Sequence, residues 1–293
     1  MKKSCFCLLA LLPLCFVSCF SPSEGVVPGL EVEDPYAARV TFNVTSIEQI
    51  PFDVIDTRAN LSSLCSRISL VVFDGDTKVK TVNQTKEDAG FGTFNVSLAP
   101  GSYQVVVMAH NGNGNCTVSS PDKITFANNK CTDTFYAYQT IEVSGDMNQN
   151  VELARCVAMF RLQTLDAIPA EVAQMQFYYT GGSSTFSAVS GYGCVNSRQT
   201  ETLNVSASQT GQPGVFEVYT FPHAQTGELK MTVTAFDSMQ GTLIEREFSQ
   251  VPVTINRVTL CTTEFFTGNG SSSNGGLTLG IQNNGEWAGI DEL

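Results

Sequence analysis

Apolar and polar residues alternate along several short segments of the chain, which is the pattern of half-buried β-strands. In the first segment, Val40, Phe42 and Val44 share one face, because successive side chains of a strand point to opposite sides of the sheet. Further strands are predicted over residues 68–73, 93–98, 103–109 and 135–143. A turn sequence, Asp74-Gly75, follows the first of these. The first half of the chain is therefore predicted to be all-β.

A second alternating region follows a polar segment, residues 144–150, which contains few β-forming residues. Its apolar faces lie in residues 158–162, 175–179, 203–205 and 229–235. Residues 170–174 could form a short helical turn, but no long run has helical periodicity. Strands at a spacing of about 8–12 residues with intervening turn signals are typical of sandwiches and barrels. We therefore expect two β-sandwich domains in tandem, residues 38–147 and 148–293.

One sequence comparison supports two related halves. Phe94 opens a strand with Phe-x-Val that ends six residues on at Pro100, and Phe216 opens a similar strand that ends six residues on at Pro222. In each half, the next strand alternates apolar residues down to an alanine. Chance convergence of two β-hairpins is the alternative, because the match is short and gapped.

The chain begins with the features of an export signal. Two lysines follow Met1, and an apolar segment then extends over residues 5–20. Pro13 interrupts this segment, so it falls short of the ~20 residues that a membrane-spanning helix needs. A short positive start followed by a short apolar core is typical of a secretory signal peptide. We therefore expect the protein to be exported.

The end of this signal favours a lipid-modified cysteine. Ser18 is a small residue directly before Cys19, and the order of apolar residues, a small residue and cysteine resembles a bacterial lipobox, in which the cysteine is acylated. We predict a lipoprotein signal peptide over residues 1–18, a lipid on Cys19 and a solvated tether over residues 19–37. A plain secretory signal with incidental cysteines is the alternative.

The chain is acidic. Its 293 residues include 16 basic and 28 acidic ones, a formal net charge of −12, and the loss of Lys2 and Lys3 with the signal leaves 14 basic residues and a charge of −14. Such a surface repels nucleic acid and anionic lipid headgroups. Only 15% of the residues are charged, which suits an extracellular β-protein. We therefore expect no nucleic-acid partner, and membrane attachment through the lipid.

Cysteines beyond the lipobox occur in an even number. They are Cys65, Cys116, Cys131, Cys156, Cys194 and Cys261. In an oxidising compartment this count allows three disulfides, which we predict without assigning their connectivity. Buried free thiols are the alternative. No Cys-x-x-Cys is present and the two histidines lie far apart, so no metal site is predicted.

The sequence has no pattern of catalytic residues. His110 follows a strand, His223 follows Pro222, and both are predicted to be exposed loop residues. Neither lies in a Gly-x-Ser-x-Gly or a His-Glu-x-x-His motif. We therefore predict that the protein is not an enzyme and has no cofactor. Asp237-Ser-Met239 resembles the short O-glycosylation acceptor of Bacteroidetes, with Ser238 as the acceptor.

The C-terminus contains a strand behind a flexible Gly/Ser/Asn run. Leu277, Leu279 and Ile281 share one face, and Trp287 follows them. We predict a terminal strand over residues 277–287. A strand behind a flexible linker suits donation to another subunit by β-strand addition. The alternative is that it folds back as the last strand of its own domain, which we expect for one isolated chain.

Several stretches of the chain occur in a characteristic order. They are the lipobox at Cys19, residues 68–74, residues 98–109, Asn256-Arg-Val-Thr leading to Phe265-Phe266, and the closing residues 281–287. In this order they resemble the FimB-like anchor or minor subunits, fimbrial lipoproteins of Bacteroidales in the fimbrillin superfamily. The resemblance implies two tandem transthyretin-like or immunoglobulin-like β-sandwich domains and a lipid anchor in the cell outer membrane. The six cysteines of the mature chain depart from the family pattern.

The resemblance also implies a function in fimbria (pilus) assembly and cell adhesion. An anchor would tether or terminate the fimbria and couple to neighbouring fimbrial subunits by β-strand exchange. The runner-up is a tip or shaft subunit, because shaft subunits of this superfamily lose their N-terminal strand to an Arg-directed protease, for which Arg39 and Arg58 are the possible sites. A surface glycan-binding lipoprotein is a further alternative, although a single tryptophan gives it little support.

Overall fold

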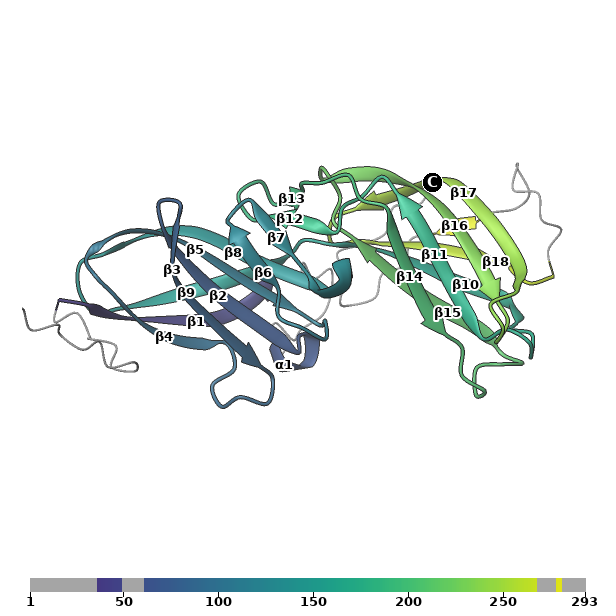
Figure 1. Ribbon diagram of the computed structural model, residues 1–293, viewed down its shortest axis with the longest axis horizontal. Helices are drawn as coiled ribbons and strands as arrows, with labels where there is room; N and C mark the ends of the chain where they lie inside the picture. Colours follow the sequence, from purple (N-terminus) through teal and green to yellow (C-terminus); the bar gives the residue numbers. More distant parts are fainter. Residues whose placement is uncertain (1–35, 49–60, 268–277, 281–293) are drawn as a thin grey trace, which may run out of the picture. The chain divides into compact units, whose positions relative to one another are not determined.

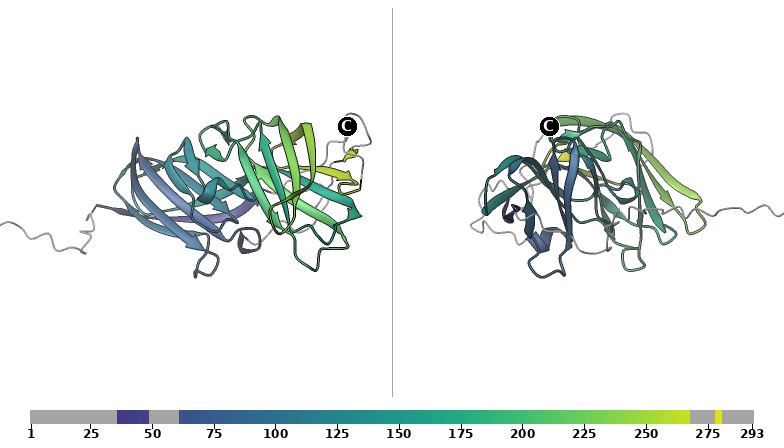
Figure 2. Two further views of the ribbon diagram at one scale, coloured as in Figure 1. Left: turned by 45° about the vertical axis from the view of Figure 1, so that its right-hand side comes forward. Right: turned by 60° about the vertical axis from the view of Figure 1, so that its left-hand side comes forward.

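The computed structural model describes residues 36–48, 61–267 and 278–280, and this part of the chain is built almost entirely from β-strands (Figure 1). Figure 2 shows the same strands from two further directions. The helical elements of the described residues are α1 (Leu61–Leu64) and the 3-10 helix η1 (Ala127–Asn129). The described residues form one compact unit. The prediction of an all-β fold is therefore confirmed.

Seven strands of the first half form one continuous sheet in the order β3-β2-β5-β8-β9-β1-β4. The strands are β1 (Ala38–Glu48), β2 (Arg67–Asp74), β3 (Thr77–Thr85), β4 (Thr93–Leu98), β5 (Gly101–His110), β8 (Thr134–Val143) and β9 (Met147–Arg155). β8 and β9 pair only through Phe135 with Arg155 and Tyr136 with Ala154. The apolar faces of the strands enclose a core that includes Phe42 and Leu153. The predicted alternation of Val40, Phe42 and Val44 places the first two in this core.

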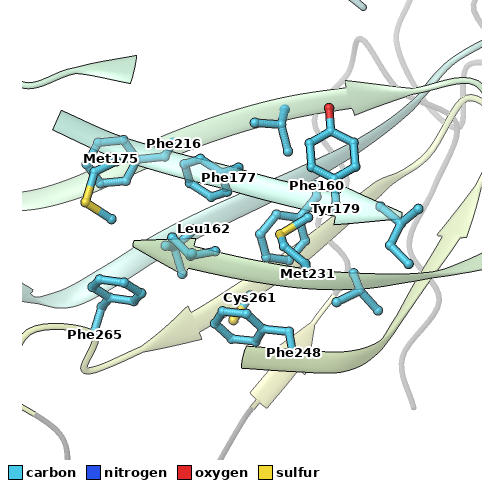
Figure 3. Close-up of a cluster of buried hydrophobic side chains, with 14 of the residues drawn as sticks. Phe160, Leu162, Met175, Phe177, Tyr179, Phe216, Met231, Phe248, Cys261 and Phe265 are labelled. Carbon is cyan, nitrogen blue, oxygen red and sulfur yellow. The ribbon is translucent and has the colours of Figure 1, made fainter. Parts of the chain in front are cut away.

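Two four-stranded sheets form the second half, in the orders β15-β10-β18-β19 and β14-β11-β16-β17. The strands are β10 (Ala158–Ala167), β11 (Gln174–Thr180), β14 (Gln199–Asn204), β15 (Pro213–Thr220), β16 (Thr226–Phe236), β17 (Thr242–Thr254), β18 (Val258–Thr263) and β19 (Thr278–Gly280). A core rich in aromatic residues fills the space between them (Figure 3). Phe160 contacts both Phe177 and Phe248 there, at ring-centroid distances of 6.5 and 6.1 Å.

The strand pairing of the first half repeats in the second. β1 is parallel to β9 and antiparallel to β4, just as β10 is parallel to β18 and antiparallel to β15. The order β3-β2-β5-β8 likewise corresponds to β14-β11-β16-β17. The sequence match described above falls on β4 and β5 in one half and on β15 and β16 in the other. The matched segments therefore occupy equivalent positions in the two sets of strands.

The switch between the two sets of strands lies later than the expected boundary at residues 147 and 148. Met147 begins β9, which pairs with β1 and β8 of the first set, and the second set begins with β10. The polar residues 144–150 are the turn between β8 and β9 and the start of β9 itself. They resembled a linker because the outward positions of β9 carry polar side chains, including Asn148, Asn150 and Glu152. We therefore correct the junction to the segment between Arg155 and Ala158.

Both sets contribute to a smaller sheet, in the order β13-β12-β7-β6. Its strands are β6 (Thr117–Ser120), β7 (Lys123–Thr125), β12 (Thr185–Ser187) and β13 (Tyr192–Gly193). Ile124 of β7 pairs with Phe186 of β12, and both side chains are fully buried. They belong to a third cluster of apolar residues, together with Phe126 and Phe221, whose rings stack at 5.3 Å. Burial of this cluster explains why the described residues of both sets form one compact unit.

Candidate functional site

The C-terminal strand β19 lies at the edge of a sheet and pairs antiparallel with β18. Three residue pairs join the two strands, with Leu279 opposite Cys261. Of the four residues predicted to form a donor strand, only Leu279 lies in the described part of the chain, whereas Leu277, Ile281 and Trp287 lie outside it. The strand thus takes the folded-back position that the sequence analysis expected for one isolated chain.

A carboxylate holds the backbone that leads toward this strand. The amide groups of Phe265, Phe266 and Thr267 donate hydrogen bonds to Asp166, at 2.9, 2.6 and 2.7 Å. The Thr267 hydroxyl donates a fourth, at 3.1 Å. Burial raises the pKa of Asp166, but hydrogen bonds from Thr267, Phe265 and Phe266 lower it more strongly, so its net pKa lies below the usual value. Asp166 is therefore an ionised anchor for the chain at residues 265–267.

Arg246 holds the same segment from the other side. Its Nε and Nη2 groups donate to the Phe265 carbonyl at 3.2 and 3.0 Å. The Phe265 ring is fully buried in the core of the second half and meets the Phe266 ring edge-on at 5.2 Å (Figure 3). We call Asp166, Arg246 and residues 265–267 the exit clamp. The clamp fixes the point at which the chain leaves this core. No local sequence pattern indicates it, because its parts are up to 101 residues apart.

β1 carries one of the two arginines predicted as protease sites. Arg39 is the second residue of β1, its side chain is exposed, and its backbone amide donates to Asp146 at 2.8 Å. β1 runs in the interior of the sheet, between β9 and β4. Arg58 lies outside the described residues. Cys19 and the predicted signal and tether up to residue 35 lie outside them as well.

The six cysteines are free thiols, which corrects the prediction of three disulfides. Cys65 and Cys261 lie in two different cores, and Cys194 is exposed. The other three belong to the third cluster, where hydrogen bonds hold two of the thiols. Cys131 Sγ donates to the Ser183 carbonyl at 3.5 Å, and Cys156 Sγ donates to the Thr134 carbonyl at 3.4 Å. Burial raises the pKa of Cys116 to about 11 and that of Cys261 to about 12, so these thiols are poor nucleophiles.

The two histidines differ in their surroundings. His223 lies in an exposed turn, as predicted, and its Nδ1 is 2.8 Å from the Gly193 carbonyl. The prediction for His110 is wrong, because β5 extends through this residue and pairs it with Arg67 and Thr134. His110 is 1% exposed and meets the Phe126 ring edge-on at 5.3 Å. Burial, and to a lesser extent the charge of Arg67, lowers its pKa to about 4.

The turn between β16 and β17 presents Ser238, the predicted glycosylation acceptor. Asp237 organises this turn, since its Oδ1 accepts hydrogen bonds from the amides of Met239 at 2.8 Å and Gly241 at 2.7 Å. Ser238 is exposed, and Met239 beside it is 89% exposed. The structure therefore leaves this tripeptide accessible.

Within residues 36–48, 61–267 and 278–280, no three His, Cys, Asp or Glu side chains gather closely enough to hold a metal ion. The same part of the chain contains no helix of the length and apolar character needed to cross a membrane.

Comparison with known proteins identifies relatives of this chain. A search of curated protein sequences finds no match. Among solved structures, a candidate polysaccharide-binding protein of Bacteroides thetaiotaomicron has 10% identity and a TM-score of 0.50, over 87% of this chain and 98% of that one. A candidate adhesin of Bacteroides ovatus has 10% identity and a TM-score of 0.48, over 73% of this chain and 82% of that one. The fimbrial anchor protein Mfa2 of Porphyromonas gingivalis has 8% identity and a TM-score of 0.42, over 77% and 90%.

At such identities the structural likeness concerns the fold alone. The sequence itself matches the family of fimbrillin-A associated anchor proteins Mfa1 and Mfa2 over residues 30–288, which is nearly the whole chain. This match agrees with the family resemblance seen in the sequence. The function of the family is associated with fimbriae. The chain therefore belongs to the fimbrillin-A associated anchor family.

Proposed function

We propose that this protein is an outer-membrane lipoprotein that acts as an anchor or minor subunit of a fimbria and couples to neighbouring subunits by β-strand exchange. The observation that carries the proposal is the position of β19, at the edge of its sheet and joined to β18 by three residue pairs. Membership of the anchor family supports the fimbrial part of the proposal.

Edge pairing makes β19 suitable for exchange. A strand added to a sheet edge gains affinity from main-chain hydrogen bonds and specificity from alternate side chains. β19 can give up its few pairs to β18 and form equivalent ones with another subunit. The exit clamp supports this step, because it holds the chain up to Thr267 by bonds that do not involve β19.

Deletion of residues 277–293 tests the donor role. The expected result is a folded protein at the cell surface that no longer retains fimbriae. A sharper variant replaces Leu277, Leu279 and Ile281 by alanine, and its matched control replaces Thr278 and Gln282, which alternate with them. Only the first variant is expected to release fimbriae into the medium. Fimbriae that stay bound to cells carrying the deletion would exclude the donor role.

Lipid attachment at Cys19 is tested separately. The acidic surface does not favour binding to anionic headgroups, so we attribute membrane attachment to an acyl chain. A palmitate analogue is expected to label the wild-type protein but not Cys19→Ala. Labelling that persists in Cys19→Ala would place the lipid elsewhere.

The tip or shaft alternative makes a different prediction at the N-terminus. A cut after Arg58 would remove β1 from between β9 and β4 and leave two strand edges able to accept a donor strand. A cut after Arg39 would leave β1 in place from Val40 onward. Sequencing of the surface protein is expected to show an N-terminus at Cys19, whereas a start at Val40 or Ala59 would favour a tip or shaft subunit.

Ser238 is proposed as an O-glycosylation site because it lies exposed in the turn after β16. Intact-mass measurement of the protein from its native host is expected to show a glycan that Ser238→Ala removes. Equal masses, apart from the one lost oxygen, would exclude this site.

A further inference from the structure

Two adjoining hollows lie beside β8 and β9. The larger has a volume of about 580 Å³ and is lined by Tyr138 and Gln139 of β8, Asn150 and Glu152 of β9, and Val189 after β12, among others. The smaller has a volume of about 320 Å³. Both are lined by Tyr136 and Ala154, and both volumes lie within the range of about 300–1,000 Å³ typical of ligand sites. We call the two together the β8–β9 cleft.

The strand pairing explains why the cleft exists. β8 and β9 pair only at Phe135 and Tyr136, and then β8 continues beside β5 while β9 continues beside β1. Beyond this point, Tyr138 and Gln139 line one side of the cleft and Asn150 and Glu152 line the other. Among the described residues, no strand pairs with β8 and β9 in this space.

Tyrosine rings in the cleft are held in place by the fold. The Tyr136 ring meets the buried Phe186 ring edge-on at 4.8 Å. The Tyr138 hydroxyl donates to Gln104 Oε1 at 2.8 Å. Both residues are half-buried, and Tyr192 lines the continuation of the cleft. Fixed aromatic rings offer apolar faces without a further loss of side-chain entropy on binding, and the C–H face of a sugar ring packs on such a surface.

Polar groups beside these rings can form hydrogen bonds with the hydroxyl groups of a sugar. Gln139 Oε1 accepts from Gln149 Nε2 at 3.5 Å, but Gln139 Nε2 is buried and has no hydrogen-bond partner among the described residues. Because Gln139 Nε2 is buried, a ligand in the cleft does not reach it, and recognition of a ligand falls to the exposed side chains of β9. Asn150 and Glu152 lie exposed on the outward face of β9, where their amide and carboxylate groups can bind neighbouring hydroxyls.

Charge narrows the class of ligand. Two arginines, Arg155 and Arg257, border the smaller hollow, and Asp133 binds the Arg155 guanidinium at 2.7 and 3.0 Å and compensates its charge. Glu152 adds a negative charge to the larger hollow, and the whole chain has a net charge of −12. Acidic sugars are therefore disfavoured in the larger hollow. We propose that the β8–β9 cleft binds a neutral oligosaccharide.

Glycan binding by the full-length protein in detergent tests this proposal. The protein is screened on an array of neutral and acidic oligosaccharides, and the affinity for the strongest neutral one is measured by calorimetry. Asn150→Ala with Glu152→Gln is expected to weaken binding at least about tenfold, as the loss of one or two hydrogen bonds implies. The matched control, Asn148→Ala with Glu142→Gln, alters exposed residues of the same two strands outside the cleft and is expected to bind like the wild type.

A second variant tests the aromatic contribution. Tyr138→Phe keeps the ring and is expected to retain most of the affinity, whereas Tyr138→Ala is expected to lose it. Thermal unfolding of each variant shows whether its fold is retained. Absence of binding to every neutral oligosaccharide, a preference for acidic ones, or unchanged affinity in the Asn150 and Glu152 variant would overturn the proposal. Fimbrial retention is expected to be unaffected by that variant, so this outcome is independent of the proposed anchor function.

Discussion

The pH dependence of the free energy of unfolding tests whether His110 is buried and neutral in the folded protein. Its Nδ1 accepts a hydrogen bond from the Gly112 amide at 3.0 Å, and its Nε2 has no hydrogen-bond partner among the described residues. The neutral ring therefore carries its proton on Nε2. A second proton on Nδ1 would face the Gly112 N–H and would place a buried charge near that of Arg67. Replacement by asparagine keeps an acceptor for Gly112 and removes the titration.

The size of the effect follows from the lowered pKa. Burial first, and Arg67 second, lower the pKa of His110 from 6.5 to about 4. As the pH falls below about 6.5, the unfolded chain gains this proton before the folded chain does, so stability decreases until the folded pKa is reached. The group contributes its full stability above pH 6.5 and has lost about 3 kcal/mol of it at pH 4, at about 1.36 kcal/mol per pKa unit.

Urea unfolding at neutral pH and near pH 4 measures this loss. Between the two conditions, the wild type is expected to lose about 3 kcal/mol more than His110→Asn. His223→Asn is the matched control, because it makes the same replacement at an exposed histidine. Equal losses in the wild type and His110→Asn would refute a neutral, buried His110.

Three further predictions concern the ion pair, the exit clamp and the thiols. Asp133→Asn is expected to destabilise the protein by about 3–5 kcal/mol in urea unfolding, because it leaves the buried guanidinium of Arg155 without its charge partner. A further Arg155→Met change is expected to recover part of this loss. Additive effects of the two changes would contradict the pairing. Asp166→Ala is expected to lower the free energy of unfolding by about 1–2 kcal/mol and to speed hydrogen exchange of the amides at residues 265–267. The control, Glu264→Gln, is expected to leave this exchange unchanged. Persistent protection of these amides in Asp166→Ala would contradict the clamp. Of the six cysteines after Cys19, only Cys194 is expected to react with a thiol reagent in the folded protein, and all six after unfolding; rapid labelling of a second cysteine would contradict the burial of that thiol.

Strands with buried apolar side chains could be predicted from the sequence. Residues 68–73 fall within β2 and residues 103–109 within β5, where nearly continuous apolar runs are buried on both faces, one against the core of the first half and the other against the third cluster. β3 and β17 were not predicted. β3 is an edge strand with no buried residue, and β17 carries charged side chains such as Glu245, Arg246 and Glu247 along much of its length. Neither strand shows the clear alternation that a sheet covered on one side imposes.

Features that depend on contacts between distant segments could not be predicted from the sequence. Burial of His110 requires that β5 extend through this residue and that Phe126 pack against it, and neither fact is visible in the local pattern. The even number of cysteines suggested disulfides, yet their side chains are distributed over three separate cores and the exposed surface. The β8–β9 cleft likewise arises from the divergence of two strands after two residue pairs.

The exit clamp determines how much of the fold a donated strand would disturb. Phe265 and Phe266 belong to the core of the second half, and the clamp bonds end at Thr267. Release of β19 therefore costs its pairing with Leu260, Cys261 and Thr262 but leaves Phe265 buried and held from both sides. Cys261 and Leu260 also keep their place, because β18 remains paired with β10 along six residue pairs. If the C-terminal strand is exchanged as proposed, we therefore expect the sandwich that presents it to stay folded.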